Sequence, residues 1–149
     1  MIPEEQYQKI LKSLPIFCLD WVVHNDGKYL LQKRTLQPLK GEWWIVGGRM
    51  RVKETLEEAA IRLQTREFGR YLGLGEMIGF SNYIFPEVED SRAIHTPAIS
   101  FLVDSPDQFT PTQDVTECGH MWTSELPATY VRETTFFREI AYSGTIDTI

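Results

Sequence analysis

The chain has 149 residues, of which 42% are hydrophobic and 24% charged, enough for a single domain over residues 1–149 with a full core. Its net charge of −6 argues against nucleic acid as a partner, and no apolar run in the sequence approaches the roughly 20 residues that span a bilayer. The polar N-terminus lacks the features of a secretory signal, so we expect a cytoplasmic protein with Cys18 and Cys118 as reduced thiols, a disulfide being the alternative.

The N-terminal part of the chain predicts a short helix followed by a hairpin. Pro3 and Pro15 bound an amphipathic segment, because proline fits the first turn of a helix and cannot continue one. Residues 16–24 and 29–35 are rich in β-branched and aromatic side chains, and Asn25-Asp26-Gly27 lies between them as a turn.

The middle of the chain predicts a buried strand, a turn and the longest helix. Residues 43–46, WWIV, form the strand, and Gly47-Gly48 forms the turn. Apolar residues then recur at helical spacing over residues 52–68, with Gly69 as the terminating residue.

The second half predicts three strands and a final helix. The strands cover residues 75–85, 97–103 and 119–123, and the helix covers residues 134–143. Together with the first half, this order of elements indicates an α+β fold, an α/β/α sandwich around a mixed β-sheet.

Positive charge is concentrated between Lys28 and Lys53, where Glu42 is the one acidic residue. The basic residues of this stretch are Lys28, Lys33, Arg34, Lys40, Arg49, Arg51 and Lys53. The stretch ends near a glycine pair at a predicted helix start, which favours an anionic ligand. Because the whole chain is acidic, we expect that ligand to be small.

The predicted central helix carries few of the carboxylates that a cluster of metal ions requires. Acidic residues at positions 63, 66 and 67 would share a face, but the chain has Leu63 and Arg66 there and keeps only Glu67. We therefore expect about one divalent ion, held by Glu67, by a backbone carbonyl of the glycine pair and by one further side chain. The alternative is that Glu67 is a solvated carboxylate.

The spacing of Gly48, Glu54, Arg62, Glu67 and Gly69 resembles the signature of the Nudix hydrolases. In that signature a glycine is followed by a glutamate, by an Arg-Glu pair, by two more glutamates and by a second glycine. Leu63 and Arg66 stand where two of those glutamates are usual.

Residues 13–70 are similar to one Nudix branch, the GDP-mannose mannosyl hydrolases, which also keep an Arg-Leu pair and one late glutamate. This resemblance implies hydrolysis of GDP-mannose or GDP-glucose at the anomeric carbon, releasing GDP and free sugar with inversion. It also implies one Mg²⁺ per active site, with Mn²⁺ as a substitute, and a homodimer.

The resemblance assigns roles to matching residues. Arg34 and Arg49 are expected to contact the diphosphate, and Asp20 to lie near the sugar. Arg62 is expected either to contact the diphosphate or to pair with Glu54.

The same resemblance implies that Glu67 and the Gly47 carbonyl hold the metal, and it leaves the general base open. The branch uses a histidine five residues before a tryptophan, and counting back from Trp122 leads to Glu117 rather than His120. Either residue can act as a base, and a site that uses neither is the third alternative.

The position of the branch's glutamine metal ligand falls on Thr116, although Gln113 would take that place if the loop has a gap. Two other functions therefore stay open. One is an ordinary Nudix pyrophosphohydrolase, and the other is a catalytically silent domain that binds nucleotide sugars.

Overall fold

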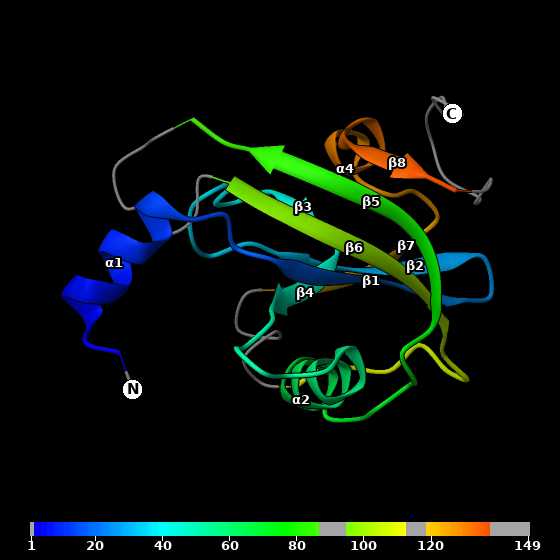
Figure 1. Cartoon of the computed structure of the whole chain (residues 1–149). Helices are drawn as coiled ribbons and strands as arrows, with labels where there is room; N and C mark the ends of the chain where they lie inside the picture. The colour runs from blue at the N-terminus through cyan, green and yellow to red at the C-terminus, as the bar shows by residue number, and fades with distance from the viewer. Residues whose placement is uncertain (1, 87–94, 113–118, 138–149) are drawn as a thin grey trace.

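The computed structural model of the chain describes residues 2–86, 95–112 and 119–137, and an eight-stranded mixed sheet forms its centre (Figure 1). The strand order is β3-β2-β1-β6-β5-β8, with β4 paired to β1 and β7 to β2. The strands are β1 (Cys18–Asn25), β2 (Lys28–Lys33), β3 (Trp43–Trp44), β4 (Val46–Arg49), β5 (Glu76–Ile84), β6 (His95–Asp104), β7 (His120–Thr123) and β8 (Thr134–Phe136). The helices are α1 (Glu4–Ser13), α2 (Leu56–Phe68) and α4 (Ala128–Glu133).

Strand β1 is central because it pairs with three others, antiparallel to β2 and β4 and parallel to β6. The parallel pair makes the sheet mixed, as predicted. The predicted hairpin between β1 and β2 is also present, and Asp26 and Gly27 both have positive φ, which a tight hairpin turn requires.

Side chains on the two faces of the sheet form two buried layers, so the predicted α/β/α arrangement is confirmed. The α2-side layer contains Leu19, Trp21, Val23, Leu30 and Val46 of the sheet and Ala59, Ala60, Leu63 and Phe68 of α2. The α4-side layer contains Val22, Leu31, Trp44, Ile78 and Tyr83 of the sheet, together with Tyr130 and Val131 of α4. Because side chains alternate along a strand, Asp20 lies on the α4 side.

Helix α2 begins later than the sequence predicts. Its N-cap is Thr55, whose hydroxyl accepts from the Glu58 backbone N–H while the Glu58 carboxylate accepts from the Thr55 N–H. Residues 52 and 53 form a turn in which Lys53 has φ +64, a conformation that a helix excludes. The predicted end is confirmed, since Gly69 adopts the left-handed conformation of a helix C-cap.

The prediction that Gly47-Gly48 forms a turn is wrong. Both glycines lie inside β4, where Gly47 is opposite Asp20 and Gly48 is opposite Leu19. A side chain on Gly47 would collide with the Asp20 carboxylate, and one on Gly48 would collide with Leu63. The glycines therefore allow close approach of other groups rather than a reversal of the chain.

The predicted helix over residues 134–143 is wrong in its described part. Helix α4 ends at Glu133, and Thr134–Phe136 continue as β8, which pairs with β5. Thr134 and Phe136 are buried while Thr135 is only partly so, which is the alternation of a strand. Residues 138–143 lie outside the described residues.

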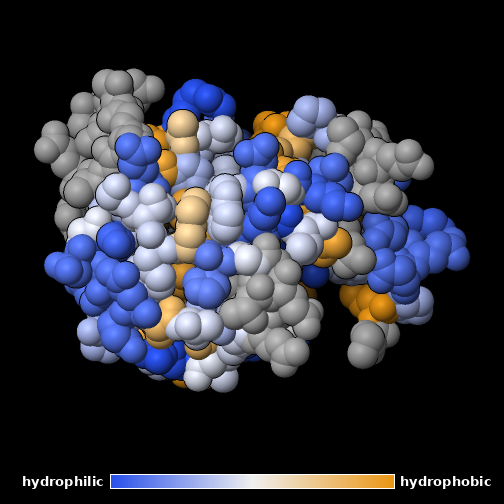
Figure 2. Space-filling view, turned by 180° about the vertical axis from the view of Figure 1, so that it is seen from behind, coloured by the Kyte–Doolittle hydropathy of each residue, from blue (hydrophilic) through white to orange (hydrophobic). Residues whose placement is uncertain are grey.

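The surface seen from behind is largely hydrophilic, with apolar residues in a narrow column and in scattered spots (Figure 2). Cys18 carries a free thiol, and Cys118 lies outside the described residues. Within the described ranges, none of the helices is both long and apolar enough to cross a membrane.

Candidate functional site

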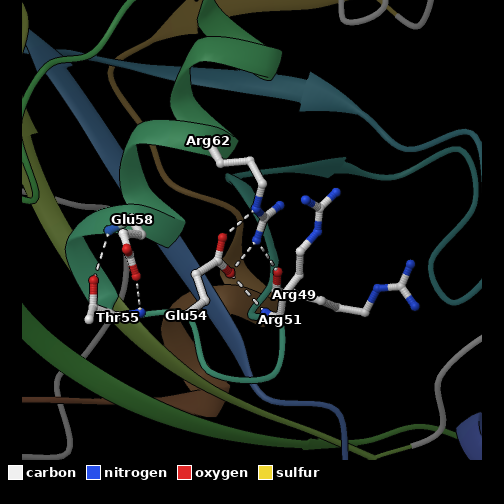
Figure 3. A network of polar contacts seen from close by, with 6 residues as sticks. All are labelled: Arg49, Arg51, Glu54, Thr55, Glu58 and Arg62. Atoms are coloured by element: carbon white, nitrogen blue, oxygen red, sulfur yellow. Dashed lines mark hydrogen bonds and ion pairs between the residues drawn. The ribbon is translucent and has the colours of Figure 1, made fainter. Parts of the chain in front are cut away.

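Glu54 and Arg62 form a bidentate ion pair that joins α2 to the segment after β4 (Figure 3). Arg62 Nε and Nη2 lie 2.5 and 2.6 Å from the two Glu54 oxygens, and Nη2 also donates to the Arg49 carbonyl at 2.9 Å. The Arg51 backbone N–H donates to the same carboxylate at 2.8 Å. The hydrogen bonds from Arg62 are the largest cause that lowers the pKa of Glu54 to about 2. Arg62 therefore holds the segment in place, and a further contact with diphosphate stays a prediction.

Asp20 is a carboxyl group buried in the middle of β1, with 7% of its surface exposed. It lies directly opposite Gly47, and its Oδ1 fills the space that a side chain on Gly47 would need. Burial raises the pKa of Asp20 to about 7, and the nearby Arg34 charge opposes that rise. Asp20 can therefore change its protonation near neutral pH.

A group of buried hydroxyls lies on the same face of the sheet as Asp20. Ser100 is opposite Asp20 in the β1–β6 pair, and Tyr130 of α4 is fully buried. Within the described structure, the hydroxyls of Ser81, Ser100 and Tyr130 are buried and make no hydrogen bond of ordinary geometry, although Ser100 lies near the Tyr130 hydroxyl and Ser81 near that of Tyr83. Sequence patterns had not pointed to these residues, because serine in a strand and tyrosine in a helix carry no distinctive signal.

Arg34 leaves the end of β2 and folds back into the loop that follows. Its Nε donates to the Pro38 carbonyl at 2.7 Å, while its backbone pairs with Glu42 and Gly41. Burial is the main cause that lowers the pKa of Arg34, and the Asp20 charge counteracts it. The partly buried Arg34 therefore lies close enough to the buried Asp20 carboxyl for their charges to interact.

Arg49 lies at the end of β4 opposite Cys18, so it shares a strand face with Gly47. Its guanidinium lies over the Tyr7 ring of α1, 4.8 Å from the ring centroid. The contact with α1 was not foreseen, although Tyr7 is on the apolar face that defines the helix.

Glu67 lies in the last turn of α2, and its side chain is 14% exposed. Arg66 Nε donates to Glu67 Oε1 at 2.6 Å, and Arg66 Nη2 forms an ion pair with the same oxygen. Within residues 2–86, 95–112 and 119–137, no group of three His, Cys, Asp or Glu side chains could hold a metal ion. One carboxylate and backbone carbonyls fit a single Mg²⁺ that takes its other ligands from phosphate or water, provided that Arg66 releases Glu67.

His120 begins β7 and lies opposite Gln32 of β2. It is two residues from Trp122, which packs on the α2-side layer, so His120 faces the side of the sheet on which α2 and Glu67 lie. Asp20 faces the other side. Glu117, Thr116 and Gln113 lie outside the described residues, and their roles stay predictions.

The comparison with protein families matches residues 19–134 to the NUDIX domain. Low-salt glycan biosynthesis protein Agl8 of Haloferax volcanii is 29% identical over 104 residues, 68% of this chain and 67% of that protein. ADP-ribose pyrophosphatase of Methanocaldococcus jannaschii is 33% identical over 90 residues, 60% of this chain and 51% of that protein. The chain thus spans about half the length of the second relative.

Solved structures share the fold. A MutT Nudix hydrolase from Burkholderia pseudomallei has a TM-score of 0.58 and 23% identity, over 74% of this chain and 84% of that one. A bifunctional NMN adenylyltransferase/ADP ribose pyrophosphatase from Francisella tularensis, solved with AMP and a manganese ion, has a TM-score of 0.53 and 19% identity. That match covers 80% of this chain and 38% of the other.

Proposed function

The chain belongs to the Nudix family, and we propose that it is a Mg²⁺-dependent hydrolase of a GDP-sugar, GDP-mannose or GDP-glucose. In this reaction water attacks the anomeric carbon, the bond from that carbon to the diphosphate oxygen breaks, and GDP and free sugar are released with inversion. Mn²⁺ is expected to support the reaction in place of Mg²⁺.

The observation that carries this proposal is the small number of carboxylates at the end of α2. Leu63 is buried in the core, Arg66 is basic, and the carboxylate of Glu67 is paired with Arg66. Attack on phosphorus draws on metal ions to activate water as well as to neutralise charge. Attack on carbon needs mainly stabilisation of the leaving diphosphate, for which one ion and a few arginines suffice.

The proposed roles are those that the family resemblance implies. Arg34 and Arg49 bind the leaving diphosphate, and Asp20 hydrogen-bonds to the sugar beside them. Glu67 and the Gly47 carbonyl hold the divalent ion, which neutralises charge on the diphosphate when bound. A base removes a proton from the attacking water on the opposite face of the sugar, and Glu117 or His120 is proposed for it.

The name of one relative supports a sugar substrate, since Agl8 is described as a glycan biosynthesis protein. The other relative favours a second candidate, hydrolysis of a diphosphate bond in a nucleoside diphosphate derivative, because it is an ADP-ribose pyrophosphatase. The products of the two reactions differ, so they can be separated directly.

The test is incubation with GDP-mannose and Mg²⁺ in ¹⁸O-labelled water, followed by mass spectrometry of the products. The proposal predicts label in free mannose and unlabelled GDP. Label in GMP or in mannose phosphate would instead establish the second candidate. Parallel assays with GDP-glucose and ADP-ribose show which sugar and which nucleobase the enzyme accepts.

We also propose that the protein is a homodimer in the cytoplasm, to which α1 contributes. Leu14 and Phe17, at the end of α1 and just after it, are 58% and 38% exposed. Light scattering during size exclusion measures the oligomeric state, and a monomeric mass at micromolar concentration would contradict the proposal.

A further inference from the structure

Arg66 places a positive charge at the point where the proposed metal would bind. Its guanidinium contacts Glu67 through both Nε and Nη2. A side-chain carbon built on Gly48 would lie 3.4 Å from Arg66 Nη2, so the same group also reaches the glycine pair of β4. The guanidinium thus lies between the carboxylate and the strand whose carbonyl is proposed as the second ligand.

A metal cation and the Arg66 guanidinium compete for the same carboxylate oxygens of Glu67, so each weakens the binding of the other. The Glu67 side chain is 14% exposed, so its interactions are less screened than those of a surface carboxylate. Arg66 is 53% exposed and can turn toward solvent. Exchange of one partner for the other therefore requires rotation of one side chain and leaves the helix unchanged.

The backbone at this point is held independently of the Arg66 side chain. The Thr112 hydroxyl lies 2.8 Å from the carbonyl oxygens of both Arg66 and Glu67, and Gly69 closes the helix. Removal of the guanidinium should consequently leave the position of Glu67 intact.

We propose that Arg66 is an internal competitor for the divalent cation at Glu67. In the ligand-free protein it neutralises the carboxylate and lowers the affinity for the metal, so the ion binds mainly together with the diphosphate of the substrate, which supplies further oxygen ligands. This inference rests on the proposed metal role of Glu67, but it is independent of which bond the enzyme cleaves.

Arg70 provides a matched control. It lies just beyond α2, pairs with Asp107 at 2.7 Å and lies 4.4 Å from the centroid of the Phe109 ring. Arg70→Ala removes the same charge from the same end of the helix, while the contacts that it removes lie away from Glu67. A general change in electrostatic potential would affect both variants alike.

The test is a Mn²⁺ titration of the nucleotide-free protein, followed by the electron paramagnetic resonance signal of free Mn²⁺. Arg66→Ala is expected to bind Mn²⁺ about three- to fivefold more tightly than the wild type, in line with the strength of a partly exposed ion pair. Arg70→Ala should stay within about twofold of the wild type. Arg66→Gln, which keeps most of the side-chain bulk, should behave like Arg66→Ala.

Equal affinities of the Arg66→Ala and Arg70→Ala proteins would overturn the proposal, as would a weaker affinity of Arg66→Ala. Glu67→Gln is measured beside them, and unchanged Mn²⁺ binding in that variant would show that the premise about Glu67 is wrong. The position of ¹⁸O in the products tests the proposed reaction separately, so failure of one does not imply failure of the other.

Discussion

At the scale of single residues, Asp20 combines burial with a position opposite a glycine. A buried carboxyl group is stable when protonated or when it has a strong cationic partner. Arg34 offsets only part of the cost of burying the charge, and the pKa of Asp20 stays raised at about 7. A neutral carboxyl can donate a hydrogen bond to a sugar hydroxyl, whereas a carboxylate can only accept one.

The raised pKa of Asp20 predicts a specific dependence of stability on pH. The unfolded chain loses this proton near pH 4 and the folded protein near pH 7, so the folded state is favoured below pH 4 and loses that advantage as the pH rises to about 7. Since each pKa unit is worth about 1.4 kcal/mol, the full effect is on the order of 4 kcal/mol. Urea unfolding of the wild type and of Asp20→Asn from pH 4.5 to 8 measures it, because asparagine does not titrate. A constant difference between the two proteins would contradict the assignment.

The glycine pair of β4 predicts two substitutions with unequal effects. A methyl group at position 47 would collide with the Asp20 carboxylate and lie 2.6 Å from the Leu19 carbonyl oxygen, which belongs to the backbone and cannot move freely. At position 48 it meets the end of the Leu63 side chain, which can rotate. We expect Gly47→Ala to lower the free energy of unfolding by about 2–3 kcal/mol and Gly48→Ala by about 1 kcal/mol. Chemical denaturation checks this order, and an equal or reversed order would be inconsistent with the packing.

At the scale of elements, α2 is joined to its surroundings at two points. Its middle is tied through Arg62 to the Arg49 carbonyl of β4 and to Glu54, and its second half is tied through Gln64, whose side chain donates to the Gly73 carbonyl and accepts from the Leu72 N–H. Gln64 is fully buried although its side chain is polar. Its amide satisfies two backbone groups of the following loop, which explains how a polar residue is accommodated there.

The pair between Glu54 and Arg62 predicts a loss of stability that lysine cannot restore. Both side chains are largely shielded, with 10% and 21% exposed, and the two hydrogen bonds depend on the fork of a guanidinium. We expect Arg62→Ala to cost about 1–3 kcal/mol and Arg62→Lys to recover less than half of it. Thermal and urea unfolding at pH 7 measure both variants. Full recovery by lysine would indicate that only the charge matters.

The same pair makes stability sensitive to acid. Because the pKa of Glu54 is lowered to about 2, its contribution is present above pH 4.5 and is lost as the pH falls from about 4.5 to 2. The Glu54→Gln protein should not show this loss of stability at low pH. The effect of Glu54 can be told apart from that of Asp20, because Asp20 lowers stability as the pH rises above 4.

At the scale of the whole molecule, the elements that periodicity describes were predictable and those that depend on distant contacts were not. Helix α2 and the β1–β2 hairpin follow from local patterns, as do their ends at Gly69 and Gly27. Whether Gly47-Gly48 is a turn or a strand depends on β1, with which it pairs, and nothing in the local sequence records that pairing. Strand β8 was mistaken for a helix for the same reason, since its partner β5 is distant in sequence.

The candidate site was predictable in part. The resemblance singled out Asp20, Arg34 and Gly47, and the structure places Gly47 opposite Asp20, with the charge of Arg34 near that carboxyl. The buried hydroxyls of Ser100 and Tyr130 and the pairing of Arg66 with Glu67 could not be predicted, because they depend on the register of β1 with β6 and on side-chain rotation.

Two titratable side chains that could act as the general base, those of His120 and Asp20, lie on opposite faces of the sheet. His120 faces the α2 side, Asp20 faces the α4 side, and each is placed by a strand that pairs with β1 or β2. A general base works only when it is deprotonated, so kcat falls at low pH as the base takes up a proton. A substitution that removes the base therefore abolishes this fall and lowers kcat by about 10²–10⁴-fold.

We expect Glu117→Gln to abolish the acidic limb of the kcat–pH profile, measured as product release from GDP-mannose, and to lower kcat at pH 8 by about 100-fold or more. If Glu117 is the base, His120→Gln should keep the limb, because the imidazole then does not accept the proton. Asp20→Asn is the discriminating control, since the pKa of Asp20 is itself about 7. If Asp20→Asn alone removes the limb, the base is Asp20, and the attacking water approaches from the α4 face. If His120→Gln alone removes it, the attack comes from the side of the sheet on which Glu67 lies, and Glu117 is not the base.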